Sequence, residues 1–211
     1  MIYLIGGAPR CGKTTTAKRL SKKLNVSWLS TDTLERVVRS CMSAKEITKK
    51  FPKTVIRRKT KYSNDLMYSQ YTTKQITSTY LKQSRAIWTA VETFVDCELY
   101  EGRSIVIEGY HIHPELVKKL SKKYGPRNVR AVFFTKMDAE DIVSKGKKFA
   151  DKNDWFVNRT KNETTYLKIA HMIVELSKFF NREAKKYNLK LYNTDTHFKN
   201  KLAEAQRYLV K

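Results

Sequence analysis

The chain has 211 residues, a length that suits one α/β domain with a sizeable hydrophobic core. No apolar run approaches the roughly 18 residues of a membrane span, and the three scattered cysteines fit a reducing cytosol better than a disulfide framework. The 43 basic residues outnumber the 20 acidic ones, and a net charge of +23 is more than an ordinary solvated surface explains. We therefore expect a single cytoplasmic domain over residues 1–211, beginning directly with its first strand and without a membrane partner.

The excess positive charge has two interpretations. An extended phosphate-rich partner such as RNA or DNA would be held through neutralisation of its phosphates. The alternative is a lysine-heavy composition without a specific partner, because Lys, Asn, Ile, Thr and Tyr are all frequent in this chain. Under both interpretations, electrostatic steering favours the arrival of anionic substrates.

The most specific motif lies near the N-terminus. Gly7 to Thr14 reads G-x-x-x-x-G-K-T, the P-loop pattern. It follows the short apolar run 2–5, which is typical of a strand, and it precedes Ala17 and Leu20, whose spacing indicates a helix. Strand, loop and helix form the context that a functional P-loop requires.

A P-loop binds the phosphates of a nucleotide, so we expect ATP and Mg²⁺ as cofactors. Its backbone N–H groups cradle the β-phosphate, Lys13 reaches the β- and γ-phosphates, and the Thr14 hydroxyl binds the metal. The side chain of Arg10 is either a surface charge or a phosphate contact, and Cys11 is either a tolerated small residue or a redox site. The residues predicted to bind the nucleotide are Gly7, Ala8, Pro9, Arg10, Cys11, Gly12, Lys13, Thr14 and Thr15.

Asp32 follows the second expected strand, residues 26–30. Phosphoryl transfer needs mainly positioning and charge stabilisation, and a single carboxylate suffices to accept the proton of a substrate hydroxyl or to align it. The alternative is a helix cap, since Asp32 and Glu35 have the spacing of a capping box. Both roles are compatible if Ser30 or Thr31 caps the helix instead.

The basic segment, residues 49–63, is predicted to lie on the acceptor side. It could grip a phosphorylated or carboxylated metabolite, track a nucleic-acid backbone, or be a plain solvated loop. Pro52 is expected to break any helix there, and one long helix is expected to follow, reaching about residue 100. The seven cations of the segment are Lys49, Lys50, Lys53, Arg57, Arg58, Lys59 and Lys61.

Glu108 ends the apolar strand expected over residues 104–109. This is the position of a Walker B acid, which holds Mg²⁺ through water or orients the acceptor. The alternative is a carboxylate satisfied by the backbone or a neighbouring cation. His111 is a candidate contact for the acceptor, whereas its spacing from His113 does not favour a metal site.

Residues 138–160, which we name the lid segment, are polar and follow a strand expected over residues 129–134. Related folds place a lid there, and a lid arginine stabilises charge on the transferring phosphoryl group. Arg159 is the best candidate for that role. A solvated basic turn is the alternative, and the competing cations are Lys145, Lys147 and Lys148.

Strands alternate with helices along the whole chain, which predicts a P-loop NTPase fold: a five-stranded parallel sheet with helices on both faces. The fifth strand is expected over residues 189–192, between a helix of about seven turns and a final helix. Ligands of such sheets bind beyond the carboxyl ends of the strands. The P-loop, Asp32, Glu108 and the loop after Tyr192 should therefore share one edge.

Several of these segments together resemble the P-loop kinases of the adenylate, shikimate and gluconate kinase type, and most of all the 2-phosphoglycerate kinase-like proteins. The resemblance implies a five-stranded parallel sheet, ATP, Mg²⁺ and transfer to a hydroxyl. Arg10-Cys11 and the basic segment depart from the family pattern, so the acceptor stays open between 2-phosphoglycerate and other anions. The segments that carry the resemblance are Ile5-Gly6-Gly7 with Gly12-Lys13-Thr14, Ser30-Thr31-Asp32-Thr33 with Arg36, Ile107-Glu108-Gly109 with His111 and Pro114, and Asn153-Asp154-Trp155.

The leading hypothesis is an ATP-dependent kinase acting on a small anionic metabolite. Its predicted catalytic residues are Lys13, Asp32, Glu108 and Arg159, and its predicted metal ligands are Thr14 and Glu108. The alternatives are a nucleic-acid kinase acting on RNA or DNA and an ATPase switch without an acceptor. The oligomeric state stays open.

Overall fold

The computed structural model describes all 211 residues, and its five strands form one parallel sheet. The sheet order is β2-β3-β1-β4-β5, so the predicted five-stranded parallel sheet is confirmed. Ile5 of β1 and Ser30 of β2 both pair with Glu108 of β3, which aligns the carboxyl ends of these three strands. The strands are β1 (Ile2–Gly7), β2 (Ser27–Ser30), β3 (Ile105–Glu108), β4 (Val129–Thr135) and β5 (Lys190–Asn193).

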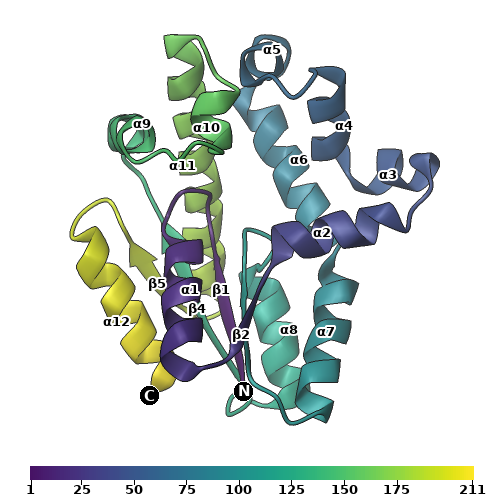
Figure 1. Cartoon of the computed structure of the whole chain (residues 1–211), viewed down its shortest axis with the longest axis vertical. Coiled ribbons are helices and arrows are strands. Elements are labelled where there is room, and N and C mark those ends of the chain that lie inside the picture. Colours follow the sequence, from purple (N-terminus) through teal and green to yellow (C-terminus); the bar gives the residue numbers. More distant parts are fainter.

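Helices cover both faces of the sheet, as predicted (Figure 1). On one face, α1 (Lys13–Leu24) packs against α12 (Phe198–Val210) and against the strands. The other face is covered by α8 (Pro114–Tyr124) and α11 (Glu163–Lys186), with α7 (Trp88–Tyr100) beside α8. No helix combines the length and apolar character that crossing a membrane requires.

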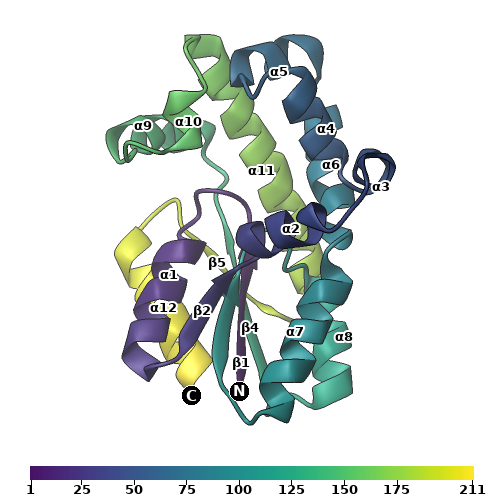
Figure 2. The ribbon, with the colours of Figure 1, turned by 45° about the vertical axis from the view of Figure 1, so that its right-hand side comes forward.

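The remaining helices lie beyond the carboxyl ends of the strands (Figure 2). One group follows β2 and the other is the lid segment. The first group comprises α2 (Thr31–Ser40), α3 (Ala44–Lys50), α4 (Pro52–Lys59), α5 (Asn64–Gln70) and α6 (Thr73–Arg85), and the lid segment contains α9 (Ala139–Lys148) and α10 (Trp155–Asn158). These helices enclose the edge at which the ligand site was expected.

Two sequence-based expectations about this group are wrong. The basic segment is helical, because Pro52 occupies the first turn of α4, where a missing N–H removes no intrahelical bond. Pro52 therefore separates α3 from α4 instead of abolishing helix. The long helix expected after this segment is divided into α5, α6 and α7, and the last break falls at Ala86–Ile87.

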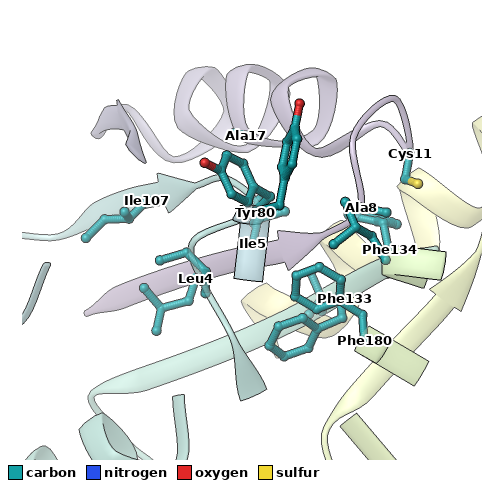
Figure 3. Close-up of a cluster of buried hydrophobic side chains, with 14 of the residues drawn as sticks. Leu4, Ile5, Ala8, Cys11, Ala17, Tyr80, Ile107, Phe133, Phe134 and Phe180 are labelled. Carbon is teal, nitrogen blue, oxygen red and sulfur yellow. The ribbon is translucent and has the colours of Figure 1, made fainter. Parts of the chain in front are cut away.

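The core lies on both sides of the central strands. Every residue of β3 is buried, and so are all residues of β1 and β4 except one in each strand, which is why these strands read as continuous apolar runs. Figure 3 shows Leu4 and Ile5 of β1 within this core. The rings of Phe133 and Phe180 stack with their centroids 6.0 Å apart and join β4 to α11.

His113 is buried in an aromatic pocket at the start of α8. Its ring packs against Trp88, Phe179 and Phe180, and its Nε2 lies 2.8 Å from Ser84 Oγ. Burial, reinforced by the charges of nearby His111 and Arg85, lowers the pKa of His113 to about 3. The folded protein therefore holds a neutral imidazole at pH values at which the unfolded chain is protonated.

We expect this histidine to make the fold sensitive to acid. The folded-state pKa lies below the unfolded value of about 6.5, so its stabilising contribution is complete above that pH and is lost as the pH falls towards 3. Between these limits His113 should lower the free energy of unfolding by about 1.4 kcal/mol per pH unit. The free energy of unfolding, measured by urea titrations at several pH values from 7 to 4, should fall less steeply with pH in His113→Gln than in the wild type. The exposed control His171→Gln should keep the wild-type dependence on pH. Equal slopes in all three proteins would contradict the assignment.

Candidate functional site

A cavity of about 640 Å³ opens at the carboxyl edge of the sheet, between the P-loop, α2, α4 and the end of the lid segment. All four residues predicted to be catalytic line it. Seven cationic side chains and three carboxylates face this space: Arg10, Lys13, Arg36, Arg39, Lys53, Arg57 and Arg159, with Asp32, Glu35 and Glu108. The cavity is therefore strongly positive, as a site for anionic ligands requires.

The P-loop has the tight backbone that phosphate binding needs. Gly7 has φ +124°, and a Cβ there would lie 2.1 Å from the carbonyl oxygen of Phe134, so only glycine fits. Gly12 has φ +94° and immediately precedes α1, whose N-terminus favours anions. Lys13 is buried, and its Nζ donates to the carbonyl oxygen of Ala8 at 2.5 Å. The loop thus curls around the side chain of its own lysine.

Thr14 and Glu108 meet across the sheet edge. The Thr14 hydroxyl donates to Glu108 Oε1 at 3.1 Å. Burial raises the pKa of Glu108, while the charge of Lys13 and the Thr14 hydrogen bond oppose that rise. Mg²⁺ that is bound to phosphate and water oxygens commonly takes a hydroxyl or a carboxylate oxygen as its protein ligand. The two residues predicted to bind the metal therefore lie together.

Asp32 lies in the first turn of α2 with its side chain 68% exposed. The cap of α2 is Ser30, whose Oγ accepts from the Asp32 N–H at 3.3 Å. Asp32 is thus not needed as the cap, and its carboxylate is free at the cavity wall, 4.0 Å from His111 Nδ1. Ser30 therefore takes the capping role weighed for Asp32, and a catalytic role for Asp32 stays a prediction.

Glu35 is the residue that sequence reasoning missed. Its Oε2 accepts from Gln83 Nε2 at 2.8 Å, His111 Nε2 at 2.9 Å and the Tyr110 hydroxyl at 3.1 Å, and Lys53 Nζ lies 3.5 Å away. Burial raises the pKa of Glu35, but the His111 hydrogen bond and the Lys53 charge outweigh burial and lower it. Glu35 is therefore an ionised carboxylate whose contacts join α2 to α4, α6 and the β3–α8 loop.

His111 does not contact the cavity, so its proposed role as an acceptor contact is wrong. It is fully buried, with Nδ1 at 2.7 Å from Thr31 Oγ1 and Nε2 on Glu35. Burial lowers its pKa, and the Glu35 hydrogen bond opposes that change. Gly109 allows this packing, because a Cβ there would lie 1.8 Å from the Thr31 hydroxyl. His111 instead fixes the start of α2, where Asp32 stands.

Three arginines in the cavity have no carboxylate partner within 4.0 Å: Arg36, Arg57 and Arg159. Arg57 Nη2 is buried and has no hydrogen-bond partner. Burial, together with the charges of Arg57 and Arg36, lowers the pKa of Arg159. These like charges repel one another, so an anion bound between them would relieve an unfavourable arrangement.

Only some cations of the basic segment and of the lid segment face the cavity. Lys53 and Arg57, one helical turn apart on α4, face the cavity, and the other five cations of the basic segment are exposed. Two of the competitors of Arg159 have acidic partners elsewhere, since Lys145 pairs with Asp141 and Lys147 with Glu163. The side chain of Arg10 contacts the lid segment, where it pairs with Asp154.

Cys11 is fully buried inside the P-loop, and burial raises the pKa of its thiol to about 11. The thiolate is the reactive form, so Cys11 should be inert near neutral pH. We expect a thiol reagent such as DTNB to titrate only two groups in the native protein at pH 8, the exposed Cys41 and Cys97, and a third after denaturation. Rapid reaction of all three native thiols would contradict this and favour a redox role for Cys11.

No family model matches the chain. It is 26% identical over 222 aligned residues to a 2-phosphoglycerate kinase of Methanopyrus kandleri, a match that covers 100% of this chain and 64% of that protein. It is 30% identical over 128 residues to a 2-phosphoglycerate kinase of Methanocaldococcus jannaschii, covering 56% of this chain and 36% of the relative. The chain thus spans less than two thirds of the length of the curated relatives that it matches.

Two solved structures have the same architecture. A gluconokinase from Sinorhizobium meliloti 1021 superposes with a TM-score of 0.56 at 10% identity, over 99% of this chain and 90% of that one. A shikimate kinase from Bacteroides thetaiotaomicron gives a TM-score of 0.56 at 13% identity, over 100% and 99% of the two chains. The chain therefore has the P-loop kinase fold, and both the fold class and the resemblance stated from the sequence are confirmed.

Proposed function

We propose that this chain, which has the P-loop kinase fold and curated relatives named as kinases, is an ATP-dependent kinase acting on a hydroxyl of a small anionic metabolite. The observation that carries the proposal is the cavity itself. It brings a P-loop and a cluster of unpaired arginines into one space of about 640 Å³. The P-loop would bind a phosphate donor, and the arginines opposite it would bind an anionic acceptor.

The donor side consists of the P-loop and the residues that would hold Mg²⁺. The backbone of Gly7 to Gly12 would cradle the phosphates, and Lys13 would exchange its bond to Ala8 for the β- and γ-phosphates. Thr14 and Glu108 would hold the metal, which when bound neutralises charge on the phosphate oxygens.

The acceptor side is formed by α2, α4 and the end of the lid segment. Asp32 is exposed to the cavity and free of a capping role, so it is suited to hold the proton of the acceptor hydroxyl. Arg36 and Arg57 would bind the anionic groups of the acceptor, because a guanidinium matches carboxylate and phosphate geometry. Arg159 would stabilise charge on the transferring phosphoryl group.

We propose 2-phosphoglycerate as the first acceptor to test. It carries both a carboxylate and a phosphate, two groups that Arg36 and Arg57 can bind, and the curated relatives are named for it. None of the relatives and structures named above is a nucleic-acid kinase by name. The cations that face the cavity converge on one space of about 640 Å³, which suits a small anion, whereas an extended backbone is held by cations spread along a surface.

Radiolabelled ATP with Mg²⁺ tests the proposal directly. The protein is incubated in turn with 2-phosphoglycerate, gluconate, shikimate, an RNA oligonucleotide bearing a 5′-hydroxyl, and no acceptor. We expect label on an anionic metabolite, above all 2-phosphoglycerate, and Lys13→Ala as the negative control. Label on RNA would support the nucleic-acid kinase instead. Release of free phosphate at the same rate with every acceptor and with none would support the ATPase switch.

A further inference from the structure

Arg10 adopts a backbone conformation that suits glycine better than arginine. Its φ is +62°, in the left-handed region that is unfavourable for residues with a Cβ. Such a conformation persists only where the surrounding contacts compensate for it, and it often marks a functional constraint. The contacts of the Arg10 side chain are therefore the place to look for that compensation.

Every polar contact of this side chain is made with the lid segment. Nη1 donates to both carboxylate oxygens of Asp154, at 2.7 and 2.6 Å, and Nη2 donates to the carbonyl oxygen of Gly146 at 2.9 Å. The guanidinium carbon also lies 4.6 Å from the centroid of the Phe156 ring. The side chains of Arg10 and Asp154 are only 17% and 14% exposed, a setting in which charge-assisted bonds are screened little by solvent.

Asp154 and Arg159, the candidate transfer arginine, flank the short helix α10. Asp154 caps α10, because its Oδ1 accepts from the Phe156 N–H at 2.9 Å, and Arg159 ends the same single turn. At the other end, Asn64 of α5 donates from its backbone N–H to the carbonyl oxygen of Arg159 at 2.8 Å. A single turn held at both ends has little freedom to change the position of Arg159.

We propose that Arg10 is a positioning residue that docks the lid segment onto the P-loop and so holds Arg159 over the cavity. The role assigned to Arg159 rests on the proposed kinase function, whereas the docking itself does not. Arg10 lies in the loop that would bind the donor, and Arg159 at the end of the lid segment. The ion pair thus links the conformation of the phosphate-binding loop to the residue that would act on the transferring group.

Three single variants test the ion pair between Arg10 and Asp154, which we name the clamp, separately from the other contacts of the lid segment. Arg10→Gly removes the clamp and is compatible with the positive φ, so the loop backbone is kept. Asp154→Asn removes the charge but keeps an oxygen to cap α10. Glu163→Gln is the matched control, because it breaks the ion pair of Lys147 to α11 at 2.5 Å, which holds the same lid segment without touching the P-loop.

Hydrogen exchange of the nucleotide-free protein tests the docking without requiring activity. We expect backbone amides of residues 139–158 to exchange about tenfold faster in Arg10→Gly and in Asp154→Asn. The double variant should exchange no faster than either single one, because both remove the same contact. Glu163→Gln should leave amides next to the P-loop at the wild-type rate. Unchanged exchange of residues 139–158 in Arg10→Gly would overturn the proposal.

Kinetics test the consequence for Arg159. We expect Arg10→Gly to lower kcat about 10- to 100-fold, since small misplacements of a catalytic group have effects of that size, with the KM for ATP changed less than about threefold. Faster exchange with an unchanged kcat would overturn the positioning role. A wild-type protein that transfers no phosphate, in the presence of the exchange effect, would instead overturn the kinase function and leave the docking intact.

Discussion

Lys13→Ala is expected to lower phosphate transfer by about 10³-fold or more while the protein stays folded. Removing one positioned cation or donor from a phosphoryl-transfer or oxyanion site has effects of about 10² to 10⁵ in rate. The Lys13 side chain is buried where it lines the cavity, and its Nζ makes one hydrogen bond within the protein, to the Ala8 carbonyl oxygen. Its ammonium group is therefore available to the β- and γ-phosphates at the cost of a single internal contact.

The matched control for this variant is Lys18→Ala. Lys18 belongs to the same helix but is exposed and lies outside the cavity. Initial rates at saturating ATP and acceptor should be unchanged in the control, and thermal unfolding should show that both variants are folded. Retention of wild-type transfer by a folded Lys13→Ala protein would contradict the assignment of the P-loop as the donor site.

Asp32→Asn is expected to lower transfer by about 10²- to 10⁴-fold, the range of general acid–base catalysis, with the affinity for ATP within about twofold of wild type. An amide cannot accept the proton of the acceptor hydroxyl, although it occupies nearly the same volume. Because Ser30 caps α2, the substitution should not unravel the first turn. The measurement pairs rates of transfer with nucleotide binding by calorimetry.

Thr33→Ala provides the control for Asp32→Asn, since Thr33 is exposed in the same turn of α2 and does not line the cavity. It should transfer phosphate at the wild-type rate. A parallel loss of nucleotide affinity and transfer in Asp32→Asn would show that the carboxylate supports the structure of the site instead of acting on the acceptor.

The sequence predicted those parts of the structure that depend on local patterns. The P-loop, the apolar strands and the acids at strand ends each lie within a few consecutive residues, and parallel sheet topology brings their ends to one edge. Asp32, Glu108 and Lys13 accordingly line one cavity. Their placement was predictable because it follows from chain order and strand direction alone.

The parts that could not be predicted depend on side chains that meet across long separations in sequence. Apart from Arg39, one helical turn away, the partners of Glu35 come from residues 18 to 76 positions away, and no local pattern marks these. Arg10 and Asp154 are separated by 144 positions. Asp32 and Glu35 have the spacing of a capping box, but in the structure Ser30 caps α2 and the buried Glu35 side chain accepts from Gln83, Tyr110 and His111 instead.

The central claim is that the P-loop holds the donor and that Arg36 and Arg57 hold an anionic acceptor. The most direct test is the pair of KM values in Arg57→Ala, measured with the acceptor found by label transfer. Arg57 is half-buried, with a buried Nη2, and removing a cation that pairs with a bound anion there costs about 2 kcal/mol. The KM for the acceptor should therefore rise about 30-fold while the KM for ATP stays within about twofold. A rise in the KM for ATP with an unchanged KM for the acceptor would contradict this division of the cavity.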